Sequence, residues 1–249
     1  MVILKLPDEI EKLRTSNRIV AEILSELREK VRPGVTTGEL NAFCEALAKK
    51  KRVKPAFKGY RGYPFALCTS VNGEVVHGMP SDRTLVTGDI VSLDFGVNYK
   101  GYYGDAAITV PVGTISDAAK RLLTVTEDGL HDAIRQARAG NRLGDVSSAV
   151  QKQVESAGYS VVRDFVGHGI GRSLHEDPQI PNFGVPGRGI ELRPGMVLAI
   201  EPMVNEGSYE VRILPDGWTV VTRDGKLSAH FEHSVAVTDN GPDILSRIQ

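Results

Sequence analysis

Cysteine is scarce in this sequence of 249 residues, which contains two, Cys44 and Cys68. They form no C-x-x-C motif, and two isolated thiols exclude the disulfide framework of a small secreted domain. We therefore expect a protein of a reducing compartment, the cytoplasm. Lys5, Pro7 and Asp8 interrupt the apolar residues at the N-terminus, which excludes the core of a signal peptide.

Long apolar runs and an excess of charge of one sign are lacking as well. No uninterrupted apolar stretch reaches about 18 residues, so the sequence predicts no membrane-spanning helix. Lys and Arg number 30 against 31 for Asp and Glu, a balance that argues against a dedicated nucleic-acid binder. There is no linker rich in Pro, Gly or Ser. With 41% hydrophobic residues the chain can bury a large core, and we predict one domain over residues 1–249.

The spacing of apolar residues predicts two pairs of helices. Residues 8–31 have helical periodicity with Asp8 as the candidate N-cap, and Thr36 forms a capping box with Glu39 that opens a second helix. Ser116 opens a helix that runs to about residue 137, and another helix starts near residue 140. Strand-like sequence follows each pair. The predicted strands are residues 89–99 and 106–112, and then 159–165, 196–200 and 230–237.

The two helix pairs share a sequence pattern. Residues 34–40 align with residues 140–146 at one offset of 106, with glycines and an acidic residue in matching positions. Chance is an alternative explanation, because a G-x-x-x-G followed by an acid is common. Two αα-then-β halves, about residues 8–113 and 114–249, predict an α+β fold with pseudo-twofold symmetry.

Two aspartates carry the first chemical signal. Asp94 lies in the predicted strand 89–99 and Asp105 just before the strand that follows it. A hairpin that turns near Tyr99-Lys100 would place them directly opposite each other, with Cβ atoms about 4.5–5.5 Å apart. Two carboxylates at this distance among apolar neighbours repel each other unless they share a proton or a divalent cation lies between them.

Three further residues favour the cation. Glu201 ends an apolar strand, Glu232 lies in the last predicted strand, and His168 stands between two glycines. Taken singly, each has an ordinary alternative as a turn, surface or core residue. Together, four carboxylates and one imidazole would neutralise two divalent ions, and this ligand set suits Mn²⁺, Fe²⁺, Co²⁺ or Zn²⁺.

In order and local context these residues resemble those of the type I methionine aminopeptidases, which have the pita-bread fold. The resemblance extends from about residue 8 to residue 245, and it implies two pseudo-symmetric halves whose helices cover a curved, mainly antiparallel sheet. Each matching segment is common by itself, but all seven in this order are specific. The segments are Val76-His77-Gly78-Met79-Pro80, Asp94-Phe95-Gly96, Gly104-Asp105, Gly167-His168-Gly169-Ile170-Gly171, His175-Glu176, Ile200-Glu201-Pro202-Met203 and Phe231-Glu232-His233.

The resemblance implies that two divalent metal ions, of Co, Mn, Fe or Zn, bind at these five residues. By resemblance, Asp105 and Glu232 bridge both ions and Asp94 binds one of them. His168 and Glu201 complete the coordination of the other ion.

The resemblance also implies which side chains meet the peptide. His77 and His175 lie beside the scissile bond in the family without binding metal. Asn72 and Ser228 match a region that can hold a structural monovalent cation. The pocket for the methionine side chain is expected to consist of Tyr60, Tyr63, Cys68 and Trp218.

The implied reaction is the hydrolytic removal of the N-terminal methionine from nascent proteins whose second residue is small. A metal-bridged hydroxide attacks the methionyl carbonyl, Glu201 moves a proton from water to the leaving amine, and His77 and His175 orient the peptide. The expected partners are the N-terminal peptides of nascent polypeptides, with transient ribosome association and no membrane. The expected enzyme is a cytoplasmic monomer.

Two positions depart from the family pattern. Leu174 precedes His175 where several relatives have Phe, and His230 stands where Gln is frequent. In a regular strand His230 would share the face of Glu232. It could therefore bind a metal ion or hydrogen-bond to a residue that does.

Three alternatives stay open at this point. An Xaa-Pro aminopeptidase or prolidase resembles this chain around the metal site but normally carries an N-terminal domain, for which the helix starting near Asp8 leaves no room. A catalytically inactive binding homologue would have lost ligands that are all present here. A dyad of Asp94 and Asp105, as in aspartic proteases, would leave the other carboxylates and His168 unexplained.

Overall fold

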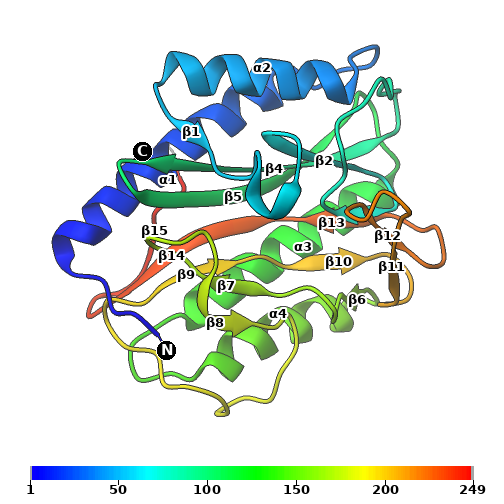
Figure 1. The fold of residues 1–249 in the computed structure, drawn as a ribbon. Coiled ribbons are helices and arrows are strands. Elements are labelled where there is room, and N and C mark those ends of the chain that lie inside the picture. The colour runs from blue at the N-terminus through cyan, green and yellow to red at the C-terminus, as the bar shows by residue number, and fades with distance from the viewer. Residues whose placement is uncertain (1, 248–249) are drawn as a thin grey trace.

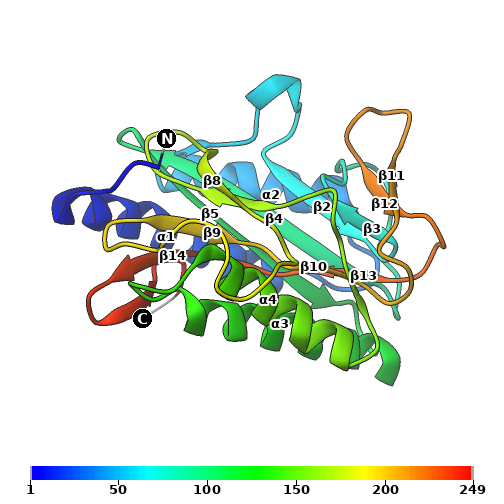
Figure 2. The same cartoon turned by 90° about the horizontal axis from the view of Figure 1, so that it is seen from below.

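The fold is built on one large curved sheet with helices packed against it, and the computed structural model describes residues 2–247 (Figure 1). The sheet has nine strands in the order β1-β4-β5-β14-β9-β7-β8, with β2 also paired to β4 and β15 to β14. Figure 2 shows α3 and α4 running along one side of the sheet. No helix within residues 2–247 is both long enough and apolar enough to cross a membrane.

Each half of the chain contributes two helices and part of the sheet. The side chains of α1 and α2 form one buried cluster with β4 and β5, and those of α3 and α4 form another with β9 and β14. The α+β architecture that the sequence predicted is therefore correct. The helices are α1 (Pro7–Arg28), α2 (Thr37–Lys50), α3 (Asp117–Gln136) and α4 (Leu143–Ser156), with a short 3₁₀ turn at Tyr60–Gly62.

The strands divide between the large sheet and two small ones. The large sheet contains β1 (Lys54–Pro55), β2 (Leu67–Val71), β4 (Ile90–Tyr99), β5 (Tyr102–Pro111), β7 (Gly167–Gly169), β8 (Glu176–Ile180), β9 (Val197–Ile200), β14 (Glu232–Thr238) and β15 (Gly241–Ile244). One small sheet contains β6 (Ser160–Val161), β10 (Met203–Asn205) and β13 (Ser228–His230). The other contains β3 (Glu74–Val76), β11 (Val211–Ile213) and β12 (Val220–Thr222).

The helix starts agree with the sequence except at the first helix. Thr36 caps α2, because its hydroxyl accepts from the amide of Glu39 at 3.1 Å and Glu39 accepts from the Thr36 amide at 2.7 Å. The predicted N-cap Asp8 is wrong: Leu6 is the N-cap and Asp8 lies in the first turn of α1. Pro7 explains the difference, since its fixed φ and missing N–H suit the first helical position.

The second helices of the two halves repeat each other closely. Both α2 and α4 have 14 residues, and each end of α4 lies 106 residues after the matching end of α2. Isolated bridges join Thr36 to Thr84 and Arg142 to Glu191, so the residue before each helix pairs with a later segment of its own half. The structural offset is the same as the offset in the sequence pattern.

The β4–β5 hairpin corrects one expectation about the two aspartates. Its turn is Lys100-Gly101, both with positive φ, so Tyr99 pairs with Tyr102. Such a two-residue turn matches the twist of the strands. As a result Asp94 pairs with Ala107, and Asp105 pairs with Gly96. The two aspartates share a face of the sheet but are diagonal neighbours, so the prediction that they lie directly opposite each other is wrong.

Two of the predicted strands of the second half are shorter or interrupted. Of residues 159–165, strand β6 includes Ser160 and Val161 alone, and residues 230–237 are divided at Phe231. The division has a structural reason, because β13 pairs with β10 in a small sheet whereas β14 pairs with β9 in the large one. The chain passes from one sheet to the other at Phe231.

Close packing of α1 on β5 fixes the backbone of Asp105. A Cβ added to Gly104 would lie 2.7 Å from the Asn17 amide nitrogen and 2.7 Å from the Ser16 carbonyl carbon. The Asn17 side chain accepts a hydrogen bond of 3.1 Å from the Asp105 amide. A glycine at 104 therefore lets the helix approach the strand at the point where the site begins.

We predict that Gly104→Ala lowers the free energy of unfolding by about 1–3 kcal/mol, because the new methyl group overlaps the α1 backbone. Urea unfolding followed by circular dichroism measures the change. Gly129→Ala is the matched control: it lies inside α3, its Cβ would meet Val154 at 3.4 Å, and alanine favours a helix. Equal stability of the Gly104→Ala protein and the wild type would contradict the packing argument.

Candidate metal centre

The pairing of four strands places two of the acidic residues, Asp94 and Glu232, in one row across the sheet. Cys68 on β2 pairs with Asp94 on β4, Asp94 pairs with Ala107 on β5, and Ala107 pairs with Glu232 on β14. Directly paired residues project from the same face of a sheet, so these side chains share one face. Ala107 keeps the space between Asp94 and Glu232 open, because its side chain is a single methyl group.

The remaining candidates join the row from neighbouring positions. Asp105 lies two residues before Ala107 on β5, and residues two apart in a strand point the same way. His168 on β7 pairs with Ala199 on β9, and Glu201 follows the end of β9. All five predicted metal ligands line one pocket.

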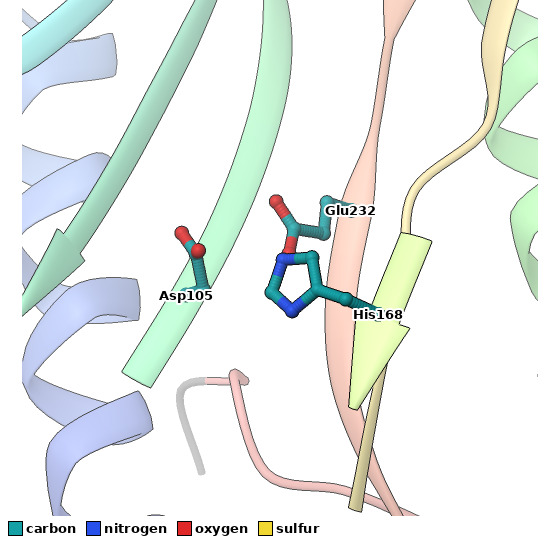
Figure 3. A group of neighbouring side chains, drawn as sticks. All are labelled: Asp105, His168 and Glu232. Atoms are coloured by element: carbon teal, nitrogen blue, oxygen red, sulfur yellow. The ribbon is translucent and has the colours of Figure 1, made fainter. Parts of the chain in front are cut away.

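Three side chains form the centre of this cluster (Figure 3). One ligand atom each from Asp105, His168 and Glu232 lies within 4.8 Å of the others, and all three residues are buried. Figure 3 shows them approaching one space from β5, β7 and β14. The Nε2 atom of His168 lies 3.6 Å from a carboxylate oxygen of Glu201. The geometry therefore joins Glu201 to the same group.

Burial makes the carboxylates hold protons strongly when they have no cation beside them. Loss of solvent raises the pKa of Asp94 to about 7. Burial, and then the charges of Asp94 and Glu201, raises the pKa of Asp105 well above its usual range. Burial and the neighbouring carboxylates raise the pKa of Glu201 and Glu232 in the same direction. Four negative charges cannot share this space without compensation.

The charge and tautomer of His168 suit a neutral metal ligand. Burial lowers its pKa to about 4, so the imidazole is uncharged at neutral pH. Its Nδ1 lies 2.9 Å from the carbonyl oxygen of Gly169, and a carbonyl oxygen can only accept. Nδ1 must therefore carry the proton, which leaves the lone pair of Nε2 directed at the carboxylates. A hydrogen bond of this kind is the usual means of orienting a metal-binding imidazole.

The residues present fit divalent metal. Oxygen atoms of Asp94, Asp105 and Glu232 are buried without a hydrogen-bond partner among the described residues. Buried polar atoms are normally paired, so unpaired carboxylate oxygens lining one pocket indicate that a cation completes them. Carboxylates with one imidazole are suitable donors for Mn²⁺, Fe²⁺, Co²⁺ or Zn²⁺.

The two histidines expected beside the peptide also line the pocket. The ring of His175 lies 4.3 Å from that of His168, and its Nδ1 lies 2.7 Å from the hydroxyl of Tyr60. His77 has a positive φ of 60°, an uncommon backbone conformation for a residue with a side chain. Burial lowers the pKa of both His77 and His175.

An aromatic wall lies next to the acidic cluster. The rings of Tyr63 and Trp218 meet edge to face with centroids 5.1 Å apart, and His77 is edge-on to Trp218 at 6.3 Å. The Tyr63 hydroxyl donates to the carbonyl oxygens of Leu67 and Gly78. These bonds fix the ring of Tyr63 in the lining of the pocket.

Three lining residues were absent from the sequence-based list of site residues. They are Phe57, Arg61 and Leu174. Leu174 is the neighbour of His175, and Arg61 lies in the segment Gly59-Tyr60-Arg61-Gly62-Tyr63-Pro64 that resembles the family's methionine pocket, but Phe57 lies in no motif. The side chain of Leu174 is buried here, where the family pattern suggested a phenylalanine.

His230 lies close to the cluster although its strand ends before Glu232. Its Nε2 is 3.7 Å from a carboxylate oxygen of Glu201, which is too long for a direct hydrogen bond. Both ring nitrogens are buried without a partner among residues 2–247. Glu201, rather than Glu232, is therefore the acidic residue that His230 approaches.

Asn72 and Ser228 are direct neighbours in the structure. The Ser228 amide donates to the Asn72 carbonyl oxygen at 2.9 Å. The side-chain amide of Asn72 bonds to Asp89 and accepts from the Ile90 amide, and the Ser228 hydroxyl donates to Asn205. The two residues thus meet at one place, which lies outside the acidic pocket.

Comparison with known proteins now decides the family. The sequence profile of metallopeptidase family M24 matches residues 11–239. A curated methionine aminopeptidase of Clostridium perfringens is 55% identical over 249 residues and covers 100% of both chains. The chain belongs to metallopeptidase family M24, among the methionine aminopeptidases. M24 membership and the acidic cluster together make it a metal-binding hydrolase.

Solved structures of M24 enzymes have the same fold. A crystal structure of a methionine aminopeptidase from Thermotoga maritima superposes with a TM-score of 0.98 at 52% identity and covers 100% of both chains. A prolidase from Pyrococcus furiosus has a TM-score of 0.81 at 24% identity, with 99% of this chain matched to 66% of that one. The prolidase likeness shows the pita-bread fold alone, which confirms the fold that the resemblance implied.

We predict that the metal-free M24 enzyme loses stability as pH rises from 6.5 to 8. A carboxyl group whose pKa is raised by folding stabilises the protein while protonated, and this stabilisation is lost as pH rises towards the folded-state pKa, about 7 for Asp94. The buried histidines, whose pKa values are lowered, partly oppose the trend near pH 6.5, where about half of each imidazole is charged in the unfolded chain, and no longer oppose it at pH 8. The melting temperature should fall by about 2–4 °C per pH unit for each carboxyl group that is still protonated in the folded protein but ionised in the unfolded chain.

Thermal melts in a chelating buffer at several pH values measure this trend. Addition of Mn²⁺ should raise the melting temperature more at pH 8 than at pH 6.5, because ligands must lose their protons to bind metal. A metal-free protein that is equally stable at both pH values would contradict the assignment of raised pKa values to the cluster.

Proposed function

We propose that this protein removes the N-terminal methionine from newly made polypeptides whose second residue is small. The observation that carries the proposal is the position of an aromatic and sulfur-lined pocket directly beside the acidic cluster. Cys68 is the strand partner of Asp94, so the wall of that pocket and the first carboxylate are adjacent on neighbouring strands. The curated relatives named methionine aminopeptidase support the same substrate.

The pocket is suited to a methionine side chain. Tyr63 and Trp218 offer apolar ring surface, and burial raises the pKa of Cys68 well above its usual range, so its thiol is neutral. A thioether gains about 0.3–1.5 kcal/mol from each sulfur–aromatic contact. Tyr60 closes another side of the pocket through its hydrogen bond to His175. These groups favour a long, unbranched, polarizable side chain over a charged one.

The side chains around the cluster support peptide hydrolysis. Asp94, Asp105, His168, Glu201 and Glu232 would hold divalent ions, which would supply a Lewis acid for the scissile carbonyl and lower the pKa of a water molecule. Glu201 would accept the proton that the attacking water loses and pass it to the leaving amine. His77 and His175, whose lowered pKa values leave them neutral, would orient the peptide by hydrogen bonds.

The finer features of the proposal follow from the resemblance. Residues 1–249 act as one catalytic domain made of two pseudo-symmetric halves, and the enzyme is a cytoplasmic monomer that associates transiently with ribosomes. Its two metal ions are drawn from Co, Mn, Fe and Zn, and a monovalent cation binds where Asn72 meets Ser228. Both cysteines are free thiols in the structure, which agrees with a reducing compartment.

A peptide assay tests the function directly. Protein stripped of metal is loaded with Co²⁺, Mn²⁺, Fe²⁺ or Zn²⁺ in turn and incubated with Met-Gly-Met-Met, and with Xaa-Pro peptides as the competing substrate class. We expect release of free methionine from the first peptide and none when Glu replaces the second residue. Asp105→Asn is the inactive control. Cleavage of the Xaa-Pro peptides alone would favour a prolidase-like hydrolase, and metal binding without cleavage of either would favour a binding homologue.

We predict that Trp218→Ala reduces the preference for methionine. The ring of Trp218 packs on Tyr63 and faces His77, so its removal widens the pocket that recognises the side chain. The ratio of kcat/KM for a Met-Gly peptide to that for a Leu-Gly peptide should fall by about 10-fold or more, which is a loss of about 1.4 kcal/mol in discrimination. An unchanged ratio would remove Trp218 from the specificity pocket.

A further inference from the structure

A buried ion pair joins the N-terminal segment to the strand that follows His175. The ammonium of Lys5 lies 2.5 Å from a carboxylate oxygen of Glu176, and their side chains are 3% and 6% exposed. Lys5 also donates to the carbonyl oxygen of Ile3 at 2.9 Å. The other Lys and Arg ion pairs within residues 2–247 all leave at least one side chain substantially exposed to solvent.

Glu176 connects this pair to both histidines of the site. It is the first residue of β8, directly after His175, and it pairs across strands with Gly169, the residue after His168. Its second carboxylate oxygen accepts from the Ser173 amide at 3.1 Å. Figures 1 and 2 both place the N-terminal segment beside β8. The carboxylate thus closes the turn that carries His175 and anchors it to Lys5.

The turn is shaped around the ion pair. A Cβ added to Gly171 would collide with the Lys5 side chain and would lie 2.6 Å from a carboxylate oxygen of Glu176. The Gly171 carbonyl oxygen accepts from the Tyr103 amide at 2.9 Å, and the Lys5 amide donates to Gly195 at 2.7 Å. Backbone hydrogen bonds therefore hold the segment around Lys5 and the segment around Gly171 in place. The Lys5–Glu176 ion pair joins these two segments.

Few side-chain contacts hold His175 itself, which is exposed at the rim of the pocket. Its ring packs against that of His168, with centroids 4.3 Å apart, and its Nδ1 lies 2.7 Å from the Tyr60 hydroxyl. A buried ion pair costs desolvation energy and is a poor means of stabilising a fold, because a well-packed apolar pair of similar volume is often as stable. The Lys5–Glu176 pair nevertheless has one defined geometry, so it can hold the neighbouring residue His175 in one position.

We propose that Lys5, acting through Glu176, is a positioning residue for His175. The inference rests on the proposed role of His175 beside the scissile peptide. The ion pair fixes the backbone at residues 173–176, and this fixes the direction in which the imidazole enters the pocket. Misplacement of a group that orients substrate lowers turnover more than it lowers ground-state binding.

The test is a double-mutant cycle in the metal-loaded enzyme. Lys5→Met is measured in the wild-type and in the His175→Ala background, with kcat and KM for Met-Gly-Met-Met. We expect Lys5→Met to lower kcat by about 10- to 100-fold in the wild type with little change in KM, and to have no further effect once His175 is absent. Lys5→Met/Glu176→Gln removes both charges at similar volume and replaces the single variant if a stranded carboxylate prevents folding.

Amide hydrogen exchange of the metal-free protein gives a readout that is independent of activity. Lys5→Met should increase exchange in residues 170–176, where the Ser173 amide is protected by Glu176. Lys51→Met is the matched control, since it breaks the 2.6 Å ion pair of Lys51 with Glu22 at a site remote from the pocket. It should leave both kcat and exchange at residues 170–176 unchanged.

The outcomes separate this inference from the proposed function. An unchanged kcat in Lys5→Met, or an equal loss in both backgrounds, would overturn the positioning role while leaving the role of His175 intact. If His175→Ala alone leaves kcat unchanged, the proposed role of His175 fails and the positioning role fails with it.

Discussion

Four carboxylates lie buried within reach of one another's charge, and their repulsion is the interaction on which the rest of the structure depends. Burial raises the pKa of each of them, so at neutral pH the cluster must hold protons or cations. A protein that kept such a cluster merely for stability would gain more from an apolar core. The neutral imidazole of His168, the open space at Ala107 and the unpaired carboxylate oxygens all suit a pair of divalent ions in the position of those protons.

The cluster exists because two similar halves meet along one sheet. The first half supplies Asp94 and Asp105 from a hairpin, and the second supplies His168, Glu201 and Glu232. The seam is the pairing of β5 with β14, which puts Glu232 next to Ala107, while the Ser234 hydroxyl donates to the Asp105 carbonyl oxygen at 2.8 Å. Helices pack on the other face of the same strands, and the loops and hairpins that carry Tyr60, Trp218 and His175 surround the cluster.

Much of this was readable from the sequence, and the errors have identifiable causes. Helix starts marked by Thr36 and Ser116 were predicted correctly because capping is a local interaction, and the five clustered residues were found because their local motifs resemble a known family. The predicted direct pairing of Asp94 with Asp105 was wrong because the hairpin turn is Lys100-Gly101, and a positive φ is not expected of a lysine. The break at Phe231 depends on which sheet each neighbouring segment joins, and the Lys5–Glu176 pair joins residues 171 positions apart. Contacts between residues far apart in the sequence, such as these, produce no periodic pattern from which they could be predicted.

Proton release on metal binding is the most direct test of the central claim. Calorimetric titration of Mn²⁺ into the metal-free protein at pH 7, repeated in buffers of different ionisation enthalpy, counts the protons exchanged with solvent. If the carboxylates hold protons until cations displace them, binding releases a net excess of protons into the buffer. Binding that occurs with no proton release would contradict the account, because it would mean that the buried carboxylates were already charged without a cation between them.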